Sequence, residues 1–508
     1  MRFFASPLIA VTSALWLTLF PSVQAQSAEY SGSLSLIESE DLFTFRYSTS
    51  EPDSSNWVGL YYSAGGGPVD GEKGSSNSIM WKWTPRSQGT VQLSASRLEP
   101  GNYTAFFLAR GGYHSLSEPL EVVKPRETGG DVAFIVSDVT LPRARIGDRY
   151  TYRLSGLVKG GNHVTFSTQG YGGWLKITEG GVLAGTPTGS AEDAVVTVRA
   201  TGTDSAAIGV FTVPVVPEGE PLIKELKVMS LNMWNGGTGV TNYHDKQVRF
   251  MASSGADIIG IQEDQSGRHI PRLANALGWW GWSSGGDVGI LSKYPMVEEY
   301  GVISGPSRSG GVRIALDGDQ QQLNFYVAHL GYTPYGPYDF CFSHMNPDRV
   351  MQREAQSGRT PQMEATLRGM KNHLDQADET PVFLVGDFNA PSHLDWVDGL
   401  KEKNCGYSNV RWPTSVLPEE AGLIDSFRVA NPDPVKVQGT TWSPVTIWNN
   451  ANRREPQDRI DFILHKGKSL KVTDSHTVVV GDPMPIPDTR YNEWFSDHAA
   501  VLTTYELE

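Results

Sequence analysis

The stretch Pro-Val-Phe-Leu-Val-Gly-Asp-Phe-Asn-Ala-Pro, residues 381–391, decides how the second half of this chain is interpreted. Val382 to Val385 form an apolar run that is too short for a helix and rich in β-forming residues, so it predicts a buried strand. Asp387 and Asn389 follow at a spacing of two, which places both on one face of an extended backbone. Together they could hold a metal ion, a phosphate or a water, although a solvated turn uses the same residue types.

The length and charge of the chain set the next limits. It has 508 residues, enough for about three domains, and carries 42 Lys and Arg against 56 Asp and Glu, a net charge of -14. Residues 226–508 alone hold 25 Lys and Arg against 34 Asp and Glu. This acidic balance argues against a dedicated high-affinity DNA-binding surface, but it does not exclude a nuclease that holds DNA through a metal.

Residues 1–25 are predicted to be a secretory signal peptide. Arg2 supplies the positive start, an apolar run follows, and Val23-Gln24-Ala25 fits cleavage after small residues. No later stretch is long and apolar enough to span a bilayer, so we expect a secreted, extracellular protein, or a periplasmic one in a bacterial host. In an oxidising compartment Cys341 and Cys405 are a candidate disulfide, with two free thiols as the alternative.

Two small β-sandwich modules are expected before residue 226. Residues 26–123 contain short aromatic-rich strands separated by Gly, Pro and Ser clusters, and residues 132–216 resemble cadherin- or immunoglobulin-like modules. Polar segments with Pro and Gly at 124–131 and 216–221 are expected to be linkers. Trp81 and Trp83 share one face of an extended segment, for which core packing is favoured over a sugar- or lipid-contacting surface. The modules are candidates for surface or glycan contact.

From residue 226 to 508 the pattern changes to strands and helices, which predicts two mixed sheets face to face with helices outside. The fold class expected is therefore two small all-β domains followed by an α/β four-layer sandwich. Six predicted strands of this last domain have a polar residue at one end, which turns alone explain poorly. These residues are Asn232, Glu263, His329, Asp387 with Asn389, Asp461, and Asp497 with His498.

This set of side chains suits phosphoester hydrolysis. Carboxylate oxygens are preferred by Mg²⁺, Mn²⁺ and Ca²⁺, whereas no Cys- or His-rich zinc spacing is present. A His held by a carboxylate can accept a proton from water near neutral pH. The sequence has neither a Gly-x-Ser-x-Gly elbow nor a phosphate-binding loop that ends in Gly-Lys-Ser/Thr, so serine hydrolases and nucleotide-driven motors are disfavoured.

An ordered set of short motifs between about residues 226 and 505 resembles the endonuclease/exonuclease/phosphatase superfamily, which has the DNase I-like fold. Each motif is weak alone, but the set in this order is specific. The motifs are Leu231-Asn232, Ile261-Gln262-Glu263, Gly289 to Pro295, Ala328-His329-Leu330, Gly386 to Asn389, Gly422 to Phe427, Arg459 to Phe462 and Ser496-Asp497-His498. The resemblance implies a four-layer sandwich and a phosphoesterase that depends on a divalent metal, with Mg²⁺ expected and Mn²⁺ or Ca²⁺ as alternatives.

The resemblance also implies roles. Glu263 would bind the metal with Asn232 beside it, and Asp497 would support the metal or its network. His498 would be the general base, oriented by Asp461, and Asp458 is the alternative for that orienting role.

Three further residues would act on the phosphate and the water. Asp387 and Asn389 would position the attacking water and stabilise the transition state, while His329 would bind the scissile phosphate. Trp442 would line the substrate cleft or belong to the core.

The substrate stays open between extracellular nucleic acid, a sphingomyelinase-like phospholipid and an inositol phosphate or other phosphorylated small molecule. A surface-binding protein with an inactive catalytic fold is the non-enzymatic alternative. Residues 331–360 contain Tyr335, Tyr338 and Cys341 and are interpreted as a long loop beside the site that shapes substrate choice.

Overall fold

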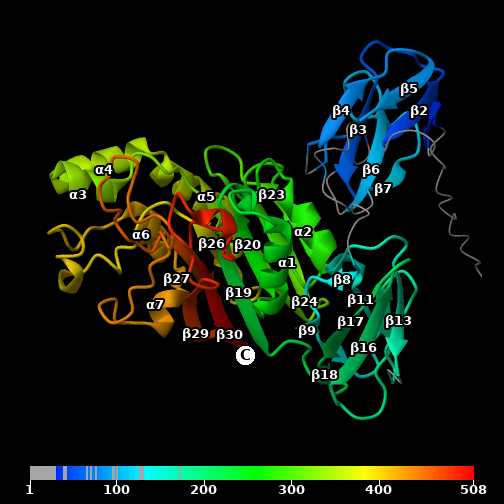
Figure 1. Cartoon of the computed structure of the whole chain (residues 1–508). Coiled ribbons are helices and arrows are strands. Elements are labelled where there is room, and N and C mark those ends of the chain that lie inside the picture. The colour runs from blue at the N-terminus through cyan, green and yellow to red at the C-terminus, as the bar shows by residue number, and fades with distance from the viewer. Residues whose placement is uncertain are drawn as a thin grey trace, which may run out of the picture.

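The computed structural model describes residues 30–37, 43–63, 67–68, 71–74, 77–93, 98, 101–124, 131–170 and 173–508. The expected signal peptide and most of the first linker, residues 125–130, lie outside the described residues. Three bodies follow one another along the chain, two small and one large (Figure 1). Among the described residues, no helix is long and apolar enough to cross a membrane.

The first module is a sandwich of two antiparallel sheets. One sheet has the order β1 (Gly32–Leu36), β2 (Thr44–Thr49), β5 (Gln88–Gln92), and the other β4 (Met80–Trp83), β3 (Trp57–Tyr62), β6 (Gly101–Leu108), β7 (Leu120–Lys124). Phe45, Val58 and Phe107 are fully buried between the sheets. Trp81 and Trp83 lie on the edge strand β4 and are 49% and 50% exposed, so the expectation that they belong to the core is wrong.

The second module is also built of short strands. Its larger sheet has the order β13 (Thr165–Gln169), β16 (Ala194–Thr201), β17 (Ala206–Val213), β9 (Asp138–Thr140), and a smaller sheet has the order β11 (Tyr150–Arg153), β15 (Val182–Gly185), β14 (Lys176–Ile177). Two strand pairs complete it: β8 (Ala133–Phe134) with β12 (Val158–Lys159), and β10 (Ala144–Arg145) with β18 (Val215–Val216).

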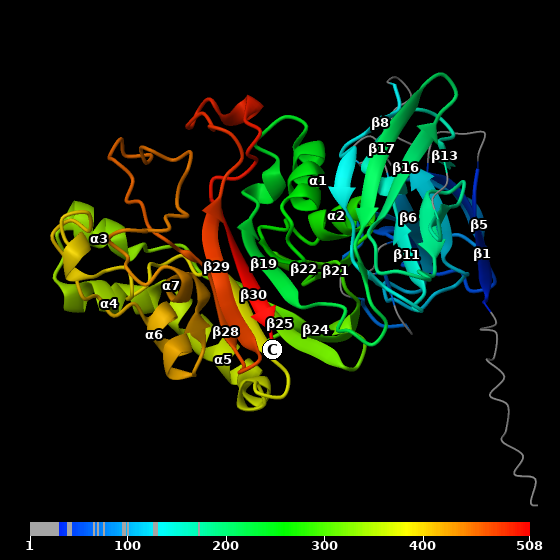
Figure 2. The ribbon, with the colours of Figure 1, turned by 90° about the horizontal axis from the view of Figure 1, so that it is seen from below.

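This second module packs against the large domain. The hydroxyl of Tyr152 donates to the carbonyl of Leu277, and Lys159 pairs with Asp245 at 2.8 Å. Figure 2 shows the strands of this module beside α1 and α2 of the large domain. One apolar cluster runs from the module core into these helices. The two parts therefore share buried surface in addition to the connecting chain.

Two six-stranded sheets form the centre of the large domain. The first has the order β21 (Trp280–Ser283), β22 (Val288–Ser292), β20 (Ile258–Gln262), β19 (Glu225–Asn232), β30 (Ala500–Leu507), β29 (Leu470–Val478). The second has the order β23 (Met296–Val302), β24 (Ser309–Asp317), β25 (Gln321–His329), β26 (Val382–Asp387), β28 (Asp461–Lys466), β27 (Ile424–Asp425).

The two sheets pack face to face through aliphatic and aromatic side chains. Ile258, Phe325 and Val385 are fully buried in the cluster between them. A Cβ atom on Gly260 would lie 2.2 Å from a methyl carbon of Val385, so glycine is required for the sheets to approach this closely.

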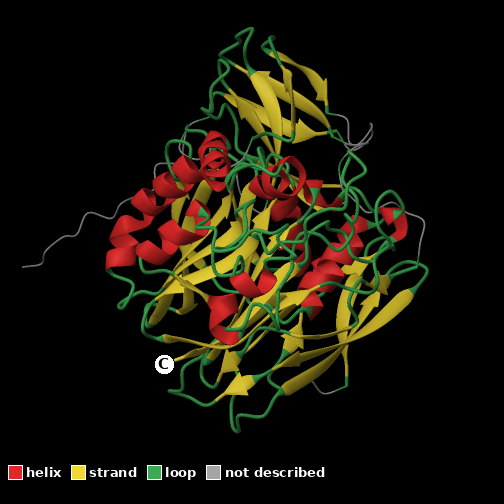
Figure 3. Cartoon of the chain, turned by 90° about the vertical axis from the view of Figure 1, so that its left-hand side faces the viewer, coloured by secondary structure: helices red, strands yellow, loops and turns green. Residues whose placement is uncertain are grey.

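Helices cover the outer faces of both sheets (Figure 3). On the first sheet these are α1 (Tyr243–Ser253) and α2 (His269–Leu277). The second sheet carries α5 (Arg359–Asp375), α6 (Pro413–Glu420) and α7 (Ser426–Ala430), with α3 (Gly336–Ser343) and α4 (Pro347–Gln356) at one end. The described chain also has four 3-10 turns, Ser155–Leu157, Asn235–Gly237, Asp398–Leu400 and Thr489–Tyr491. The four-layer α/β sandwich predicted from the sequence is confirmed.

Candidate active site

Strand register brings the predicted polar residues to one end of the two sheets. β25 runs parallel to β26, so His329 lies beside Asp387, and β28 runs antiparallel to β26, so Asp461 lies on its other side. In the facing sheet, β19 and β20 are parallel and place Asn232 beside Gln262, one residue before Glu263. Parallel strands end at the same edge, and an antiparallel strand begins there, which explains why distant residues meet.

His498 and Asp461 form a buried pair at the centre of this edge. The Nδ1 atom of His498 lies 2.8 Å from Oδ2 of Asp461, and both residues are less than 5% exposed. Burial alone would lower the pKa of His498, but the carboxylates of Asp461, Asp387 and Asp497 raise it to about 10.

Asp458, the alternative to Asp461, contacts other residues. It accepts hydrogen bonds from Nε1 of Trp396 at 3.2 Å and from the hydroxyl of Tyr335 at 2.9 Å. The structure therefore places Asp461, and not Asp458, against His498.

Asp387 lies beside His498 and forms several hydrogen bonds with its neighbours. Oδ2 accepts from the side-chain amide of Asn232 at 3.1 Å and lies 3.8 Å from Nε2 of His498. Oδ1 accepts from the backbone N–H of Asn389 at 2.8 Å, and the Asn389 side chain donates to the Leu330 carbonyl. Burial favours protonation of Asp387, but His498 and His329 outweigh it and lower the pKa of this carboxyl.

His329 has a partner that sequence reasoning missed. Its Nδ1 atom hydrogen-bonds Asp287, and its Nε2 atom lies 3.5 Å from Asp387. Burial would lower the pKa of His329, but these two carboxylates raise it well above its ordinary value, so the imidazole is cationic. Asp287 precedes β22, which runs antiparallel to β20, so a polar residue before this strand lies at the same edge as Glu263. Asp287 was not among the site residues predicted from the sequence.

The predicted metal set is Glu263, Asn232 and Asp497. Glu263 accepts from the Asn232 amide at 3.2 Å and from the backbone N–H of Asn235, and its backbone has a φ of 64°. The side-chain amide of Asn232 donates to Glu263 and Asp387, and its oxygen accepts one hydrogen bond, from the backbone of Trp234 at 2.8 Å.

Two buried oxygens at this edge have no hydrogen-bond partner among the described residues: Oδ1 of Asp497 and Oδ1 of Asp461. Burial raises the pKa of Asp497 to about 7, while His498 lowers it and Glu263 raises it further. Carboxylate oxygens without a donor, close to other acids, fit a divalent cation.

A second grouping of potential ligands is also present. One atom each from Asp387, Asp461 and His498 lie within 4.8 Å of one another. Two of these residues already form the 2.8 Å hydrogen bond of the buried pair, which a shared ion would have to replace. Glu263 with Asp497 and this trio are therefore two candidate ligand groups at the same edge.

A cavity of about 360 Å³ opens over these residues. Trp442 lines it, with its ring 5.0 Å from the ring of His498, so of the two roles considered for Trp442 the structure supports the cleft. Tyr332, Tyr335 and Tyr338 line the cavity from the segment after His329.

The segment 331–360 was interpreted as a long loop, which is wrong for most of its length, because α3 and α4 lie within it. Pro337 and Pro347 stand in the first turns of these helices, where proline is tolerated. A disulfide joins Cys341 of α3 to Cys405, with a Cα–Cα distance of 5.1 Å. The bridge ties the aromatic segment to the chain that follows β26.

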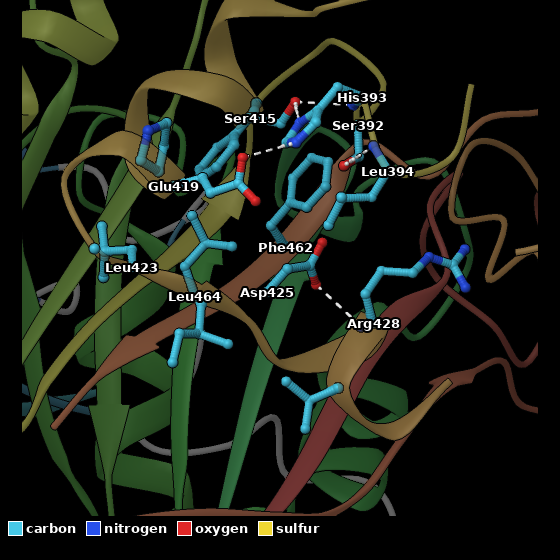
Figure 4. A pocket seen from close by; sticks show the side chains of 15 residues that line it. Ser392, His393, Leu394, Ser415, Glu419, Leu423, Asp425, Arg428, Phe462 and Leu464 are labelled. Atoms are coloured by element: carbon cyan, nitrogen blue, oxygen red, sulfur yellow. Dashed lines mark hydrogen bonds and ion pairs between the residues drawn. The ribbon is translucent and has the colours of Figure 1, made fainter. Parts of the chain in front are cut away.

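A second cavity, also of about 360 Å³, lies behind the site and is largely apolar (Figure 4). Phe388 and Phe462, which line it, are the neighbours of Asp387 and Asp461 in the sequence. His393 bonds Ser415 at 2.8 Å and Glu419 at 3.1 Å there, which looks like a catalytic chain. However, the Ser415 oxygen also accepts from the His393 backbone and lies 3.0 Å from the Trp412 carbonyl, so its hydrogen bonds are those of a structural residue.

Comparison with known proteins agrees with this geometry. The sequence model of the Endonuclease/Exonuclease/phosphatase family matches residues 229–498. A Caenorhabditis elegans protein described as uncharacterized protein F14F9.5 is 31% identical over 292 residues, which cover 55% of this chain and 91% of that protein.

Solved structures with similarity to the chain include truncated TDP2 of Caenorhabditis elegans, at 17% identity and a TM-score of 0.37, covering 56% of this chain and 98% of that one. The human Nocturnin catalytic domain with bound sulfate has 15% identity and a TM-score of 0.38, covering 57% and 97%.

The large domain is thus that of a metal-dependent phosphoesterase. The chain belongs to the endonuclease/exonuclease/phosphatase family and is a hydrolase acting on phosphoester bonds.

Proposed function

We propose that His498 removes a proton from a water molecule that attacks a phosphoester, and that Asp461 fixes the orientation and tautomer of its ring. The observation that carries this proposal is the 2.8 Å buried pair of His498 and Asp461 at the wall of the cavity. With Nδ1 bound to the carboxylate, Nε2 is the atom left to accept the proton.

Glu263 and Asp497 would hold the divalent cation, for which Mg²⁺ is the first candidate and Mn²⁺ and Ca²⁺ the alternatives. A bound cation would offset the carboxylates that raise the pKa of His498, which would lower that pKa and leave Nε2 free to accept a proton, and it would also offset the charge of the phosphate.

The remaining residues position the reactants. His329, held cationic by Asp287 and Asp387, binds a phosphate oxygen, and Asp387 with Asn389 orients the water. The water oxygen forms a new bond to phosphorus, the bond from phosphorus to the ester oxygen breaks, and the alcohol leaves with a proton. No covalent enzyme intermediate is required.

We further propose that the protein is exported and acts on an extracellular phosphoester. The predicted signal peptide supports export, and with it an extracellular nucleic acid, a phospholipid or a phosphorylated small molecule as substrate. The acidic balance of residues 226–508 weighs against a long polyanion.

The β modules would hold the enzyme at a glycan surface. Trp81 and Trp83 are half exposed on an edge strand, with ring centroids 4.8 Å apart and ring planes at 68°, so they offer exposed aromatic surface that a sugar ring can contact. We expect the double variant W81A/W83A to lose retention on insoluble polysaccharide at unchanged hydrolytic rate. Retention equal to that of the unaltered protein would contradict this role.

The activity is tested with DNA, RNA, sphingomyelin and phosphomonoesters, each with Mg²⁺, Mn²⁺ or Ca²⁺. His498→Ala and Glu263→Ala are expected to abolish whichever activity is found. His476→Ala and Glu298→Ala, which change exposed residues far from the cavity, are the matched controls. If either site variant retains near-full rate, the assigned roles are wrong.

A further inference from the structure

The cavity over His498 has an aromatic wall. Tyr335 and Tyr338 meet edge to face, with ring centroids 5.1 Å apart, and Trp442 lies against His498. Tyr332 stands at the mouth with 70% of its surface exposed. Aromatic faces turned into a cavity beside the phosphate site can surround an organic group of the substrate.

Glu455 also lines the cavity, and its two carboxylate oxygens have different hydrogen-bond environments. Oε1 accepts from the Tyr338 hydroxyl at 2.6 Å and from Nε1 of Trp442 at 2.8 Å. Oε2 is buried and accepts no hydrogen bond from any described residue, although the residue lines the cavity and is only 3% exposed. Burial raises the pKa of Glu455, while hydrogen bonds from Tyr338, Trp442 and Asn449 favour its charged form. A buried, unsatisfied carboxylate oxygen calls for a donor or a cation.

Apart from His329 and His498, the ionisable residues that line the cavity and carry charge are all acidic. The charged groups are Glu263, Asp387, Glu455 and Asp497, and the described lining contains neither Lys nor Arg. A polynucleotide brings flanking phosphates that proteins neutralise with Lys and Arg, and this wall offers none. A small ester with a positive organic group fits the same lining without that cost.

We propose that Glu455 and the surrounding aromatic residues, Tyr332, Tyr338 and Trp442, form a subsite for an ammonium group on one alcohol of a small phosphodiester. The inference rests on the proposed function, because it assigns the organic part of the same substrate. Aromatic faces attract ammonium groups, and the attraction grows when water is excluded. The carboxylate of Glu455 in the cavity wall adds electrostatic attraction for a positive group.

Three p-nitrophenyl phosphodiesters that share one leaving group test the subsite. Their second alcohol is choline, ethanol or thymidine, and release of p-nitrophenol reports each rate. We expect kcat/KM for the choline ester to exceed that for the ethyl ester by about tenfold, which corresponds to about 1.4 kcal/mol. Glu455→Gln, which keeps the acceptor for Tyr338 and Trp442 but removes the charge, should bring the ratio close to one. Tyr332→Leu should lower it without disturbing the core, since that ring is exposed.

Glu419→Gln, a change of an exposed carboxylate on the second cavity, is the control and should keep the tenfold ratio. Equal rates on the choline and ethyl esters, or a ratio that survives in Glu455→Gln, would overturn the subsite. Preference for the thymidine ester would overturn it in favour of a nucleic-acid substrate. If none of the three esters is hydrolysed while DNA, RNA, sphingomyelin or a phosphomonoester is, the subsite is overturned and the proposed function stands; if no substrate is hydrolysed with any of the metals, the proposed function itself fails.

Discussion

The imidazole of His498 is held by Asp461 through a 2.8 Å hydrogen bond, although the two residues are 37 positions apart in the sequence. Both residues are less than 5% exposed, so the hydrogen bond between them is shielded from bulk water. We expect Asp461→Asn to lower kcat by about 10²-fold or more, because the amide no longer stabilises the imidazolium or its tautomer. Initial rates at saturating substrate measure this. Asp458→Asn should lower kcat much less, since Asp458 bonds Tyr335 and Trp396 instead of His498. Equal losses of kcat in the two variants would contradict the assignment of the orienting role to Asp461.

Metal dependence gives a second prediction. Removal of divalent ions with a chelator should abolish activity, and Mg²⁺, Mn²⁺ or Ca²⁺ should restore it. Metal should also raise the thermal unfolding temperature, because an ion that binds only the folded state stabilises it. In Glu263→Gln this thermal shift should disappear. An unchanged shift in that variant, measured by scanning fluorimetry, would place the ion elsewhere, with the Asp387, Asp461 and His498 trio as the next candidate.

Asp287 provides a third test, since it was found only in the structure. It keeps His329 protonated, and a cationic imidazole binds phosphate better than a neutral one. We expect Asp287→Asn to raise the inhibition constant of inorganic phosphate by about tenfold, with a smaller effect on kcat. Asp319→Asn, at an exposed turn, is the control. An unchanged inhibition constant of phosphate in Asp287→Asn would contradict a role of His329 in phosphate binding.

The disulfide leads to a fourth prediction. Cys341 and Cys405 are separated by 64 residues, and closing a loop of that length stabilises the folded state by about 4 kcal/mol in the chain-entropy model. Cys341→Ser with Cys405→Ser should therefore lower the free energy of unfolding of the large domain by about that amount. Mass spectrometry of the non-reduced protein should detect no free thiol. Two free thiols would reject the bridge.

The stability of the protein should fall in mild acid, partly because of His465. Burial lowers the pKa of His465 to about 4, so the folded state leaves this ring neutral while the unfolded chain protonates it near pH 6.5. Its contribution is fully present above pH 6.5 and is lost as the pH falls toward 4, by up to about 1.4 kcal/mol for each pH unit. Urea unfolding at pH 7 and pH 5 measures the change. His465→Asn, which can keep the bond to Ser426, should have a smaller difference between the two pH values; an equal difference would contradict the assignment.

The second cavity is lined by residues that neighbour Asp387 and Asp461 in the sequence, so substitutions in its wall can change the rate indirectly. Phe388 and Phe462 stack with ring centroids 4.9 Å apart and flank the catalytic edge from behind. Substitutions there act on Asp387 and Asp461 through the strands that carry them. Loss of rate in such variants is therefore a positioning effect.

The sequence by itself predicted the fold class and the polar residues that meet at the site, because strand periodicity and polar residues at strand ends are local features of the chain. The strand at 382–387 and its Asp387 and Asn389 are the clearest case. The family followed from the resemblance of the ordered motifs between residues 226 and 505. The tertiary structure alone decided that Asp461 and not Asp458 faces His498, that Asp287 holds His329, and that Asn232 donates to the acids. It also decided that Trp81 and Trp83 are exposed and that Glu455 has a free oxygen beside the aromatic wall. These outcomes depend on register and on which sheet face a side chain occupies, and a shift of one residue reverses that face.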